Sequence, residues 1–334
     1  MKRSRTELAD DGEEAPGRRT VAVLGLVGVL AACALGLAAL WRWRPLLSSA
    51  PGNALAATSQ PTATAAPTSA ALSDMNVVLL GIDRRPDGDA SWRTDTIIIV
   101  AVRPQAGLVG LFSIPRDLWV EIPGQETNRI NTVDYLGEQA YGSGGGPRLL
   151  QETLQQHLNI SLQGYMRVDF VGLKRVIDSL GGITVNPDRS YDDMIDDGTC
   201  PPWHMHIDPG PQHMDGCTAL GYIRTRAQYD DLDRCRREQQ VLLAIREAAL
   251  RPTMLPQLPR LLTSLAGAVD TDLSPSQLTS LLALAGRLGP AAYRTRVIDR
   301  TMVRDWTTPG GAMVLVPDWV GIRQAWDEFL VSPS

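Results

Sequence analysis

The chain has 334 residues, of which 44% are hydrophobic and 21% are charged, which is an ordinary balance for a globular protein. This length suffices for one large domain with appendages. The formal net charge of −5 argues against a general nucleic-acid-binding protein, because such binding depends on a basic surface, so we expect no nucleic-acid partner. The charge leaves room for a local basic site.

The first part of the chain predicts a membrane anchor. Residues 1–19 are polar, whereas residues 20–40 form an uncharged segment of 21 residues, long enough to cross a bilayer core of about 30 Å as a helix. The Trp and Arg residues at 41–44 are typical of an interfacial anchor. A cleaved signal peptide is the alternative, but its apolar region spans only about 7–15 residues. We therefore expect an uncleaved, single N-terminal transmembrane helix over residues 20–40.

Charge and composition predict the topology around this helix. More basic side chains precede the span than follow it, which favours a cytoplasmic tail over residues 1–19 and an extracytoplasmic remainder. Residues 41–73 are rich in Ala, Pro, Ser and Thr and cannot bury a core, so they predict a linker. The folded domain is expected over residues 74–334.

Apolar runs and helical patterns alternate along this domain. Strands are predicted at residues 75–83, 94–104, 107–117 and 183–187. Helices are predicted at residues 147–158, 170–182 and 233–250, over much of 253–290, and after a last strand within 312–330. This alternation predicts an α/β fold, a layered α-β-α domain around a central mixed sheet.

Charged residues gather at the ends of the first three predicted strands. Proline cannot continue a central strand, so Pro115 should end the third strand and present Arg116 and Asp117 at its tip. The other charged or polar side chains at these ends or soon after them are Asp83, Arg84, Arg85, Arg93, Asp95, Arg129 and Asn131. Loops beyond strand ends are where sites form in such sheets.

A second group of charges lies farther along the chain. Arg224 and Arg226 would share a face with Tyr222 in an extended segment but would diverge in a helix, and we expect the extended form. One side of the following helix is predicted to carry Asp231, Arg234 and Glu238.

Many arginines with a few aspartates suit a pyrophosphate–Mg²⁺ site. The planar guanidinium binds phosphate oxygens through two parallel contacts, and Mg²⁺ prefers few carboxylates, several waters and substrate phosphates. Taken singly, each residue is equally consistent with a surface ion pair worth at most about 1 kcal/mol, or with a helix N-cap in the case of Asp231 or Asp233. Their joint placement on strand ends and one helix head favours the site.

These segments resemble the LytR-CpsA-Psr family of bacterial enzymes that attach glycopolymers to peptidoglycan. The resemblance covers roughly residues 76–250, and its markers are "NVVLLGID", "RTDTIIIV", "SIPRDLWVEIPG", "RIN", "VDFVGLKRVIDSLGGITV", "MDGCTALGYIRTR" and "DLDRCRREQQ". It implies an extracytoplasmic, membrane-anchored phosphotransferase that uses Mg²⁺ (or Mn²⁺). The implied partners are a polyprenyl-pyrophosphate-linked glycopolymer and a peptidoglycan acceptor hydroxyl.

The resemblance also implies roles for individual residues. The implied pyrophosphate-binding residues are Arg85, Arg116, Arg129, Arg224, Arg226 and Arg234. Asp83 and Asp95 would be the metal carboxylates, and Asp231 the base that acts with Arg116 and Arg224 in catalysis. Asp117 would orient a neighbouring arginine.

Two positions depart from the family pattern. Arg129 replaces the usual lysine, which keeps the charge but changes a point donor to a fork. Glu238 replaces the usual glutamine, and a carboxylate there would repel phosphate unless it pairs with an arginine or helps to bind metal.

Two other functions remain compatible with clustered arginines. One is a polyprenyl-pyrophosphate hydrolase that uses water as the acceptor. The other is a non-catalytic cell-surface module that binds polyanions or regulates wall assembly, and only this one does without the metal carboxylates.

Three cysteines lie outside the predicted membrane helix, where disulfides persist. Cys200, Cys217 and Cys235 allow three pairings, of which we favour Cys200–Cys217 because it would close the loop between them. This loop contains His204, His206 and His213, which predict either a zinc site or a disulfide-stapled loop near the acceptor.

Overall fold

The computed structural model describes residues 72–84, 92–196, 198–225, 231–254, 257 and 268–331. The predicted cytoplasmic tail, the transmembrane helix and nearly all of the linker lie outside these residues, as do Arg85 and Arg226. No helix within the described ranges has both the length and the apolar character needed to cross a membrane.

A mixed six-stranded sheet forms the centre of the domain, in the order β11-β6-β1-β2-β3-β12. Its strands are β1 (Met75–Asp83), β2 (Arg93–Arg103), β3 (Leu108–Ser113), β6 (Gly164–Asp169), β11 (Val269–Thr271) and β12 (Tyr293–Val297). β1, β2 and β3 pair antiparallel in chain order, β11 pairs antiparallel with β6, and the parallel pairs are β1 with β6 and β3 with β12. The central mixed sheet is therefore confirmed.

The middle strands are buried on both faces, which explains their unbroken apolar runs. Ile97 and Ile99 of β2 point into one hydrophobic cluster, and Ile98 between them points into another. Their branched side chains pack well on a pleated surface and favour the strand conformation.

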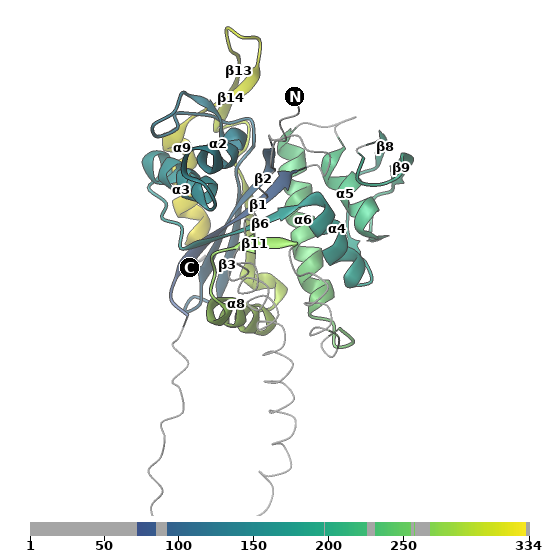
Figure 1. Cartoon of the computed structure of the whole chain (residues 1–334). Helices are drawn as coiled ribbons and strands as arrows, with labels where there is room; N and C mark the ends of the chain where they lie inside the picture. The colour runs from purple at the N-terminus through teal and green to yellow at the C-terminus, as the bar shows by residue number, and fades with distance from the viewer. Residues whose placement is uncertain are drawn as a thin grey trace, which may run out of the picture.

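Helices cover both faces of the sheet (Figure 1). On one side lie α2 (Val133–Tyr141), α3 (Gly145–Leu158) and α9 (Trp319–Leu330). On the other lie α4 (Phe170–Ser179), α5 (Gly216–Arg224) and α6 (Asp231–Ala249), and α8 (Pro275–Arg287) lies near one end of the sheet. The predicted α-β-α layering is confirmed.

Four two-stranded antiparallel sheets lie outside the central sheet in the part of the chain that the structure describes. They are β4 (Trp119–Val120) with β5 (Asn128–Arg129), β7 (Ile183–Val185) with β10 (Gln212–Met214), β8 (Tyr191–Ile195) with β9 (Trp203–Ile207), and β13 (Val303–Thr307) with β14 (Met313–Pro317). Two 3-10 turns, η2 (Ile130–Thr132) and η3 (Pro290–Ala292), complete the described elements. The β13–β14 hairpin projects from the top of the molecule in Figure 1.

The prediction of an extended segment at Arg224 is wrong. Arg224 is the last residue of helix α5. Asp215 is the N-cap of this helix, and its side chain accepts a hydrogen bond from the backbone N–H of Thr218. Ala219 and Leu220 are fully buried, so packing of an apolar helix face outweighs the alternation that suggested a strand. Arg224 therefore does not share a strand face with Tyr222.

The favoured disulfide is confirmed. Cys200 and Cys217 are bonded, and their Cα atoms lie 6.0 Å apart. Cys235 is a buried free thiol on α6. The bond ties the β8–β9 hairpin to the start of α5 and leaves the described part of α6 without a disulfide.

Candidate active site

Arg116 lies at the end of β3, where the sequence places it. The strand ends at Ser113, the N–H of Ile114 still donates to the Ile97 carbonyl at 2.9 Å, and Pro115 then interrupts the ladder. The Arg116 guanidinium donates through Nη1 to Asp95 Oδ1 at 2.7 Å. Burial alone would lower the pKa of Arg116, but the carboxylates of Asp95 and Asp231 raise it above its ordinary value. Arg116 is therefore a fixed, permanently charged cation.

A β-bulge directs Asp95 toward Arg116. Gly81 of β1 pairs with Thr96, but the next residue, Ile82, pairs with Thr94, so Asp95 is an extra residue in β2. A bulge bends the strand and re-aims its side chains, which is common beside functional sites. The carboxylate thus leaves the regular ladder and reaches the tip of β3.

The first turns of α6 bring the predicted trio onto one side of the helix. Arg234 Nη2 lies 2.9 Å from Asp231 Oδ1, and Arg234 Nε lies 3.4 Å from Glu238 Oε1. The same Asp231 oxygen lies 3.2 Å from Arg116 Nε. Two guanidinium groups from separate elements therefore meet at one carboxylate. Only 4% of the Arg234 side chain is exposed.

Asp231 is held in a largely buried position. Burial raises the pKa of its carboxyl group, although the charges of Arg234 and Arg116 oppose this shift. Its second oxygen, Oδ2, is buried and has no hydrogen-bond partner among the residues that the structure describes. A buried oxygen without a partner favours the protonated form, so this carboxyl is suited to accept a proton.

Glu238 is more deeply buried and pairs with Arg234, as the departure from the family pattern requires. The Thr96 hydroxyl donates to Glu238 Oε1 at 2.8 Å. Burial raises the pKa of Glu238 to about 7, against the lowering effect of Arg234 and of the Thr96 hydrogen bond. The side chain is therefore near its titration point at neutral pH, and its repulsion of phosphate depends on its protonation. Thr96 was not predicted as a site residue, because the motif "RTDTIIIV" does not show which of its side chains face Glu238.

Asp117 orients a neighbouring arginine, as expected. Its Oδ1 lies 3.1 Å from Nε of Arg129 on β5, and its Oδ2 lies 3.6 Å from Arg116 Nε. Arg129 also donates through Nη2 to the Met313 carbonyl at 2.7 Å. Arg129 therefore joins the cluster through Asp117 rather than by direct contact with Asp231.

Asp83 and Arg224 form a looser pair beside this cluster. Their closest atoms, Asp83 Oδ2 and Arg224 Nη2, are 3.9 Å apart. The Arg224 guanidinium carbon lies 4.3 Å from the centre of the Phe170 ring, which is a favourable cation–π contact. A small cavity of about 20 Å³ is lined by Arg224, Arg234 and Glu238, so Arg224 lies beside the first turns of α6.

The donor set near Asp83 and Asp95 suits Mg²⁺ bound mainly by water and substrate phosphate. Asp83 ends β1 and Asp95 lies near the start of the neighbouring strand β2. Within the described ranges, no group of three or more His, Cys, Asp or Glu side chains is arranged to hold a metal. Mg²⁺ commonly uses only one or two carboxylates, so the chemistry of these two side chains is compatible with the ion.

The histidine loop is a stapled hairpin. Asp192 contacts two histidines, with Oδ1 2.8 Å from His204 Nε2 and Oδ2 2.8 Å from His206 Nδ1. His213 lies on a different pair of strands, in β10. The zinc alternative gains no support from the described residues, which contain no three-ligand cluster.

Arg237 has a structural role that was not predicted from the sequence. It is almost fully buried, contacts Asp233 at 2.9 Å, and donates to the carbonyls of Tyr222 and Thr225. It thereby fixes the end of α5 against α6 and positions Arg224. The "DRCRRE" run gives no hint of which arginine faces the interior.

The fold and site define a mixed α/β domain in which buried arginines and aspartates converge beyond the strand ends. The LytR_cpsA_psr family model matches residues 50–303. The chain belongs to the LytR-CpsA-Psr family.

Individual relatives agree with this membership. The chain is 34% identical over 210 residues to a protein of Oceanobacillus iheyensis named polyisoprenyl-teichoic acid--peptidoglycan teichoic acid transferase TagU, covering 62% of each chain. It is 29% identical over 205 residues to regulatory protein MsrR of Staphylococcus aureus, covering 60% of this chain and 57% of that one. The match thus spans less than two thirds of either relative.

Solved structures share the fold. The crystal structure of B. subtilis TagV has a TM-score of 0.62 at 23% identity and covers 78% of this chain and 99% of TagV. A structure of TagT bound to LI-WTA has a TM-score of 0.57 at 20% identity and covers 77% of this chain and 91% of that one. At these identities the likeness shows the α/β fold alone.

Proposed function

We propose that this chain is a phosphotransferase that moves a phosphoglycosyl group from a polyprenyl-pyrophosphate-linked glycopolymer to a peptidoglycan hydroxyl. The observation that carries the proposal is the meeting of Arg116 and Arg234 at Asp231, with Arg224 beside the same helix head. Family membership supports it, as does the name of TagU, which gives transfer to peptidoglycan for that relative.

The arginines supply the binding energy for the donor. Phosphoryl transfer depends mostly on positioning and on neutralisation of charge on the phosphate oxygens. Arg116 and Arg234 are mostly buried, so their charges are weakly screened and act strongly on a bound diphosphate. Without donor, Asp95 and Asp231 balance these charges, and phosphate oxygens would replace those contacts. Arg129 and Arg224 extend the cationic surface, and Arg85 and Arg226 are assigned the same role by their place in the family motifs.

Asp231 accepts the proton in this scheme. The acceptor oxygen forms a bond to the phosphorus atom that carries the glycopolymer. The bond from that phosphorus to the bridging oxygen breaks, and polyprenyl phosphate leaves with the bonding electrons. The hydroxyl proton passes to Asp231, whose raised pKa suits it as a base.

Asp83 and Asp95 would hold Mg²⁺ (or Mn²⁺), together with water and phosphate oxygens. The ion would add positive charge against the diphosphate. Both carboxylates lie next to an arginine, at 3.9 Å and 2.7 Å respectively, so their charges are balanced in the free protein as well.

The segment over residues 20–40 would anchor the domain on the outer side of the bacterial cell membrane. The lipid-linked donor of the enzyme would lie in that membrane, and the acceptor would lie outside it. An anchored enzyme with a linker over residues 41–73 would reach both.

Removal of single arginines tests the proposal. Arg116→Ala and Arg224→Ala should each reduce the release of polyprenyl phosphate on the order of 100-fold, because each removes a cation from the phosphate site. Arg148→Ala is the control, since Arg148 lies on the exposed face of α3, where its described side-chain contacts are an ion pair with Glu152 and a cation–π contact with Tyr141. Unchanged turnover in both site variants, with the fold intact by circular dichroism, would refute the arginine site.

Hydrolysis of the same donor and a regulatory role are the alternatives, and the name of MsrR gives the second some weight. Mass spectrometry of wall fragments from a deletion strain separates the three. Loss of glycopolymer from peptidoglycan, restored by the wild-type gene but not by Arg116→Ala, supports transfer. Turnover of the donor with an unchanged wall supports hydrolysis, and the absence of any turnover supports a regulatory or polyanion-binding module.

A further inference from the structure

A cavity of about 410 Å³ opens beside Asp231, and neither Arg116 nor Arg234 is among the residues that line it. Its walls are the head of α6, the loop after β3 and the β13–β14 hairpin, and it is larger than the small cavity at Arg224. Its volume lies within the range of roughly 300–1,000 Å³ that is usual for ligand sites. Asp117 and Asp231 line this cavity and also contact Arg116, so one pair of carboxylates separates it from the arginines.

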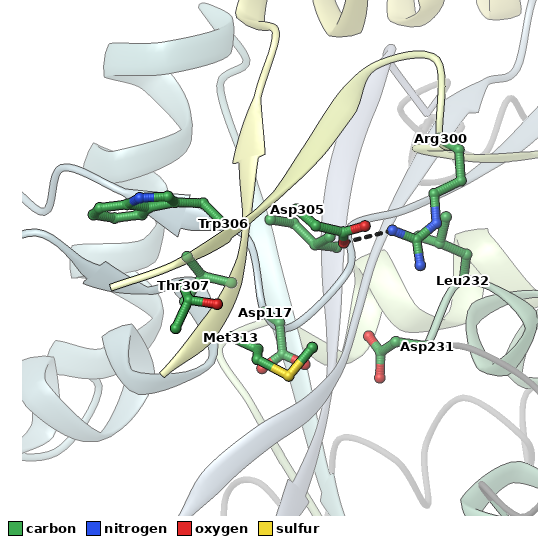
Figure 2. Close-up of a pocket in the computed structure, with 10 residues that line it drawn as sticks. Asp117, Asp231, Leu232, Arg300, Asp305, Trp306, Thr307 and Met313 are labelled. Carbon is green, nitrogen blue, oxygen red and sulfur yellow. Dashed lines mark hydrogen bonds and ion pairs between the residues drawn. The ribbon is translucent and has the colours of Figure 1, made fainter. Parts of the chain in front are cut away.

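Carboxylates predominate among the polar groups of this cavity, and those of Asp117 and Asp231 are shared with the arginine cluster. Figure 2 shows three carboxylates at the cavity, those of Asp117, Asp231 and Asp305, together with the guanidinium of Arg300. Arg300 is held by Asp305 at 2.6 Å. Such a lining presents hydrogen-bond acceptors, which hydroxyl and amide groups can satisfy and which phosphate oxygens, being acceptors themselves, cannot. The donor diphosphate and this cavity are therefore mismatched.

One strand of the hairpin, β14, is tied to the domain, and most residues of the other, β13, are exposed. The N–H of Leu315 donates to the Asp117 carbonyl at 2.9 Å, and Arg129 binds the Met313 carbonyl, so β14 is tied to the loop that carries Arg116. Met313 is 72% exposed and Trp306 is 40% exposed, and both line the cavity. An apolar rim beside hydrogen-bonding carboxylates matches a pyranose ring, which has apolar C–H faces and a hydroxylated edge.

We propose that this cavity binds the acceptor, as a saccharide ring of the peptidoglycan glycan strand without a phosphate group. The proposal rests on the proposed function, because that function requires an acceptor hydroxyl within reach of Asp231. It places the donor and the acceptor on opposite sides of one carboxylate. Asp231 lines the cavity, so a saccharide bound there would lie beside the residue assigned as the base.

Thr307→Trp tests the site by filling the cavity. Thr307 lines it from β13 and is exposed, so the change should leave the fold intact. Arg304→Trp is the matched control, because it adds the same ring to the same strand at a position that does not line the cavity. The full chain, purified in detergent, is titrated with soluble, uncrosslinked glycan fragments of peptidoglycan and assayed for turnover of the lipid-linked donor.

The wild-type chain and Arg304→Trp should bind the fragments, and Thr307→Trp should bind them at least tenfold more weakly. In turnover, Thr307→Trp should raise the KM for the acceptor by a similar factor and leave the KM for the donor unchanged. If Thr307→Trp weakens fragment binding but the wild-type chain transfers nothing, the cavity assignment is supported and the proposed function is refuted. Transfer with an unchanged acceptor KM in Thr307→Trp, or no fragment binding by the wild type, overturns the cavity assignment. A rise in donor KM alone also overturns it, since the cavity would then hold the donor.

Discussion

Replacing Glu238 with glutamine should change how the stability of this protein depends on pH. Glu238 is 6% exposed, accepts a hydrogen bond from Thr96 and lies 3.4 Å from Arg234 Nε. Glutamine has nearly the same shape, and its carbonyl oxygen can accept the same hydrogen bond from Thr96. The substitution therefore removes the titrating group while keeping the packing.

The magnitude follows from the pKa of Glu238, which burial raises from 4.5 to about 7. Because the folded state binds this proton more tightly than the unfolded state, its contribution to stability is present below pH 4.5 and is lost as the pH rises to about 7. The difference between the two pKa values corresponds to a free energy on the order of 3 kcal/mol. Relative to Glu238→Gln, the wild type should lose about this much stability between about pH 4 and about pH 8.

Urea unfolding followed by tryptophan fluorescence measures this difference, since the chain contains 8 tryptophans. The free energy of unfolding of both proteins is determined at half-unit steps of pH, and the difference between them is plotted against pH. All other titrating groups are shared, so their contributions cancel as long as their surroundings are unchanged.

Glu152→Gln provides the control, because it removes the same type of side chain from an exposed position on α3. Its difference curve should vary by less than about 1 kcal/mol, as expected for an exposed ion pair. A flat curve for Glu238→Gln would show that the pKa of Glu238 is the same in the folded and unfolded states, so that Arg234 and Thr96 fully compensate its burial. That result would refute the assignment of a titrating carboxyl beside the phosphate site.

Three further variants probe the metal, the disulfide and the core. Asp83→Asn should raise the Mg²⁺ concentration for half-maximal turnover by about tenfold, and turnover of the wild type that persists in EDTA would contradict this role. Cys200→Ser with Cys217→Ser opens a loop with a sequence separation of 17 and should lower the free energy of unfolding by about 3 kcal/mol, with no further loss on adding reductant. Gly110→Ala would place a Cβ atom 2.5 Å from a ring carbon on α9 and should destabilise by about 1–3 kcal/mol, unlike Gly289→Ala, where the added atom meets nothing within 4 Å.

Local rules predicted those parts of the site that depend on one element. Pro115 ends β3 and leaves Arg116 at its tip because a missing N–H stops the ladder wherever it occurs. Asp231 and Arg234 share one side of α6 because helical spacing alone fixes that relation. The family motifs then added the expectation that these separate elements meet.

Features that depend on pairing between distant segments were not predicted. The bulge that turns Asp95 toward Arg116 exists only in the register of β2 against β1, which no local pattern in β2 specifies. The parallel neighbours β6 and β12 carry polar side chains among their apolar ones, so their short runs gave no strand signal. The error at Arg224 has the same origin, since burial of the α5 face is decided by its contacts with the rest of the domain.

In the proposed mechanism, the sharing of Asp231 Oδ1 by two arginines gives donor binding a consequence for the base. Arg116 and Arg234 both lower the pKa of Asp231, and they are the groups that a diphosphate would bind. Phosphate oxygens that take over these guanidinium groups remove the stabilisation of the Asp231 carboxylate and add negative charge beside it. Both effects raise the pKa of Asp231 further, so its affinity for a proton increases when the donor is in place. The carboxylate that balances the arginines in the free protein thereby becomes the stronger base once the phosphates displace it.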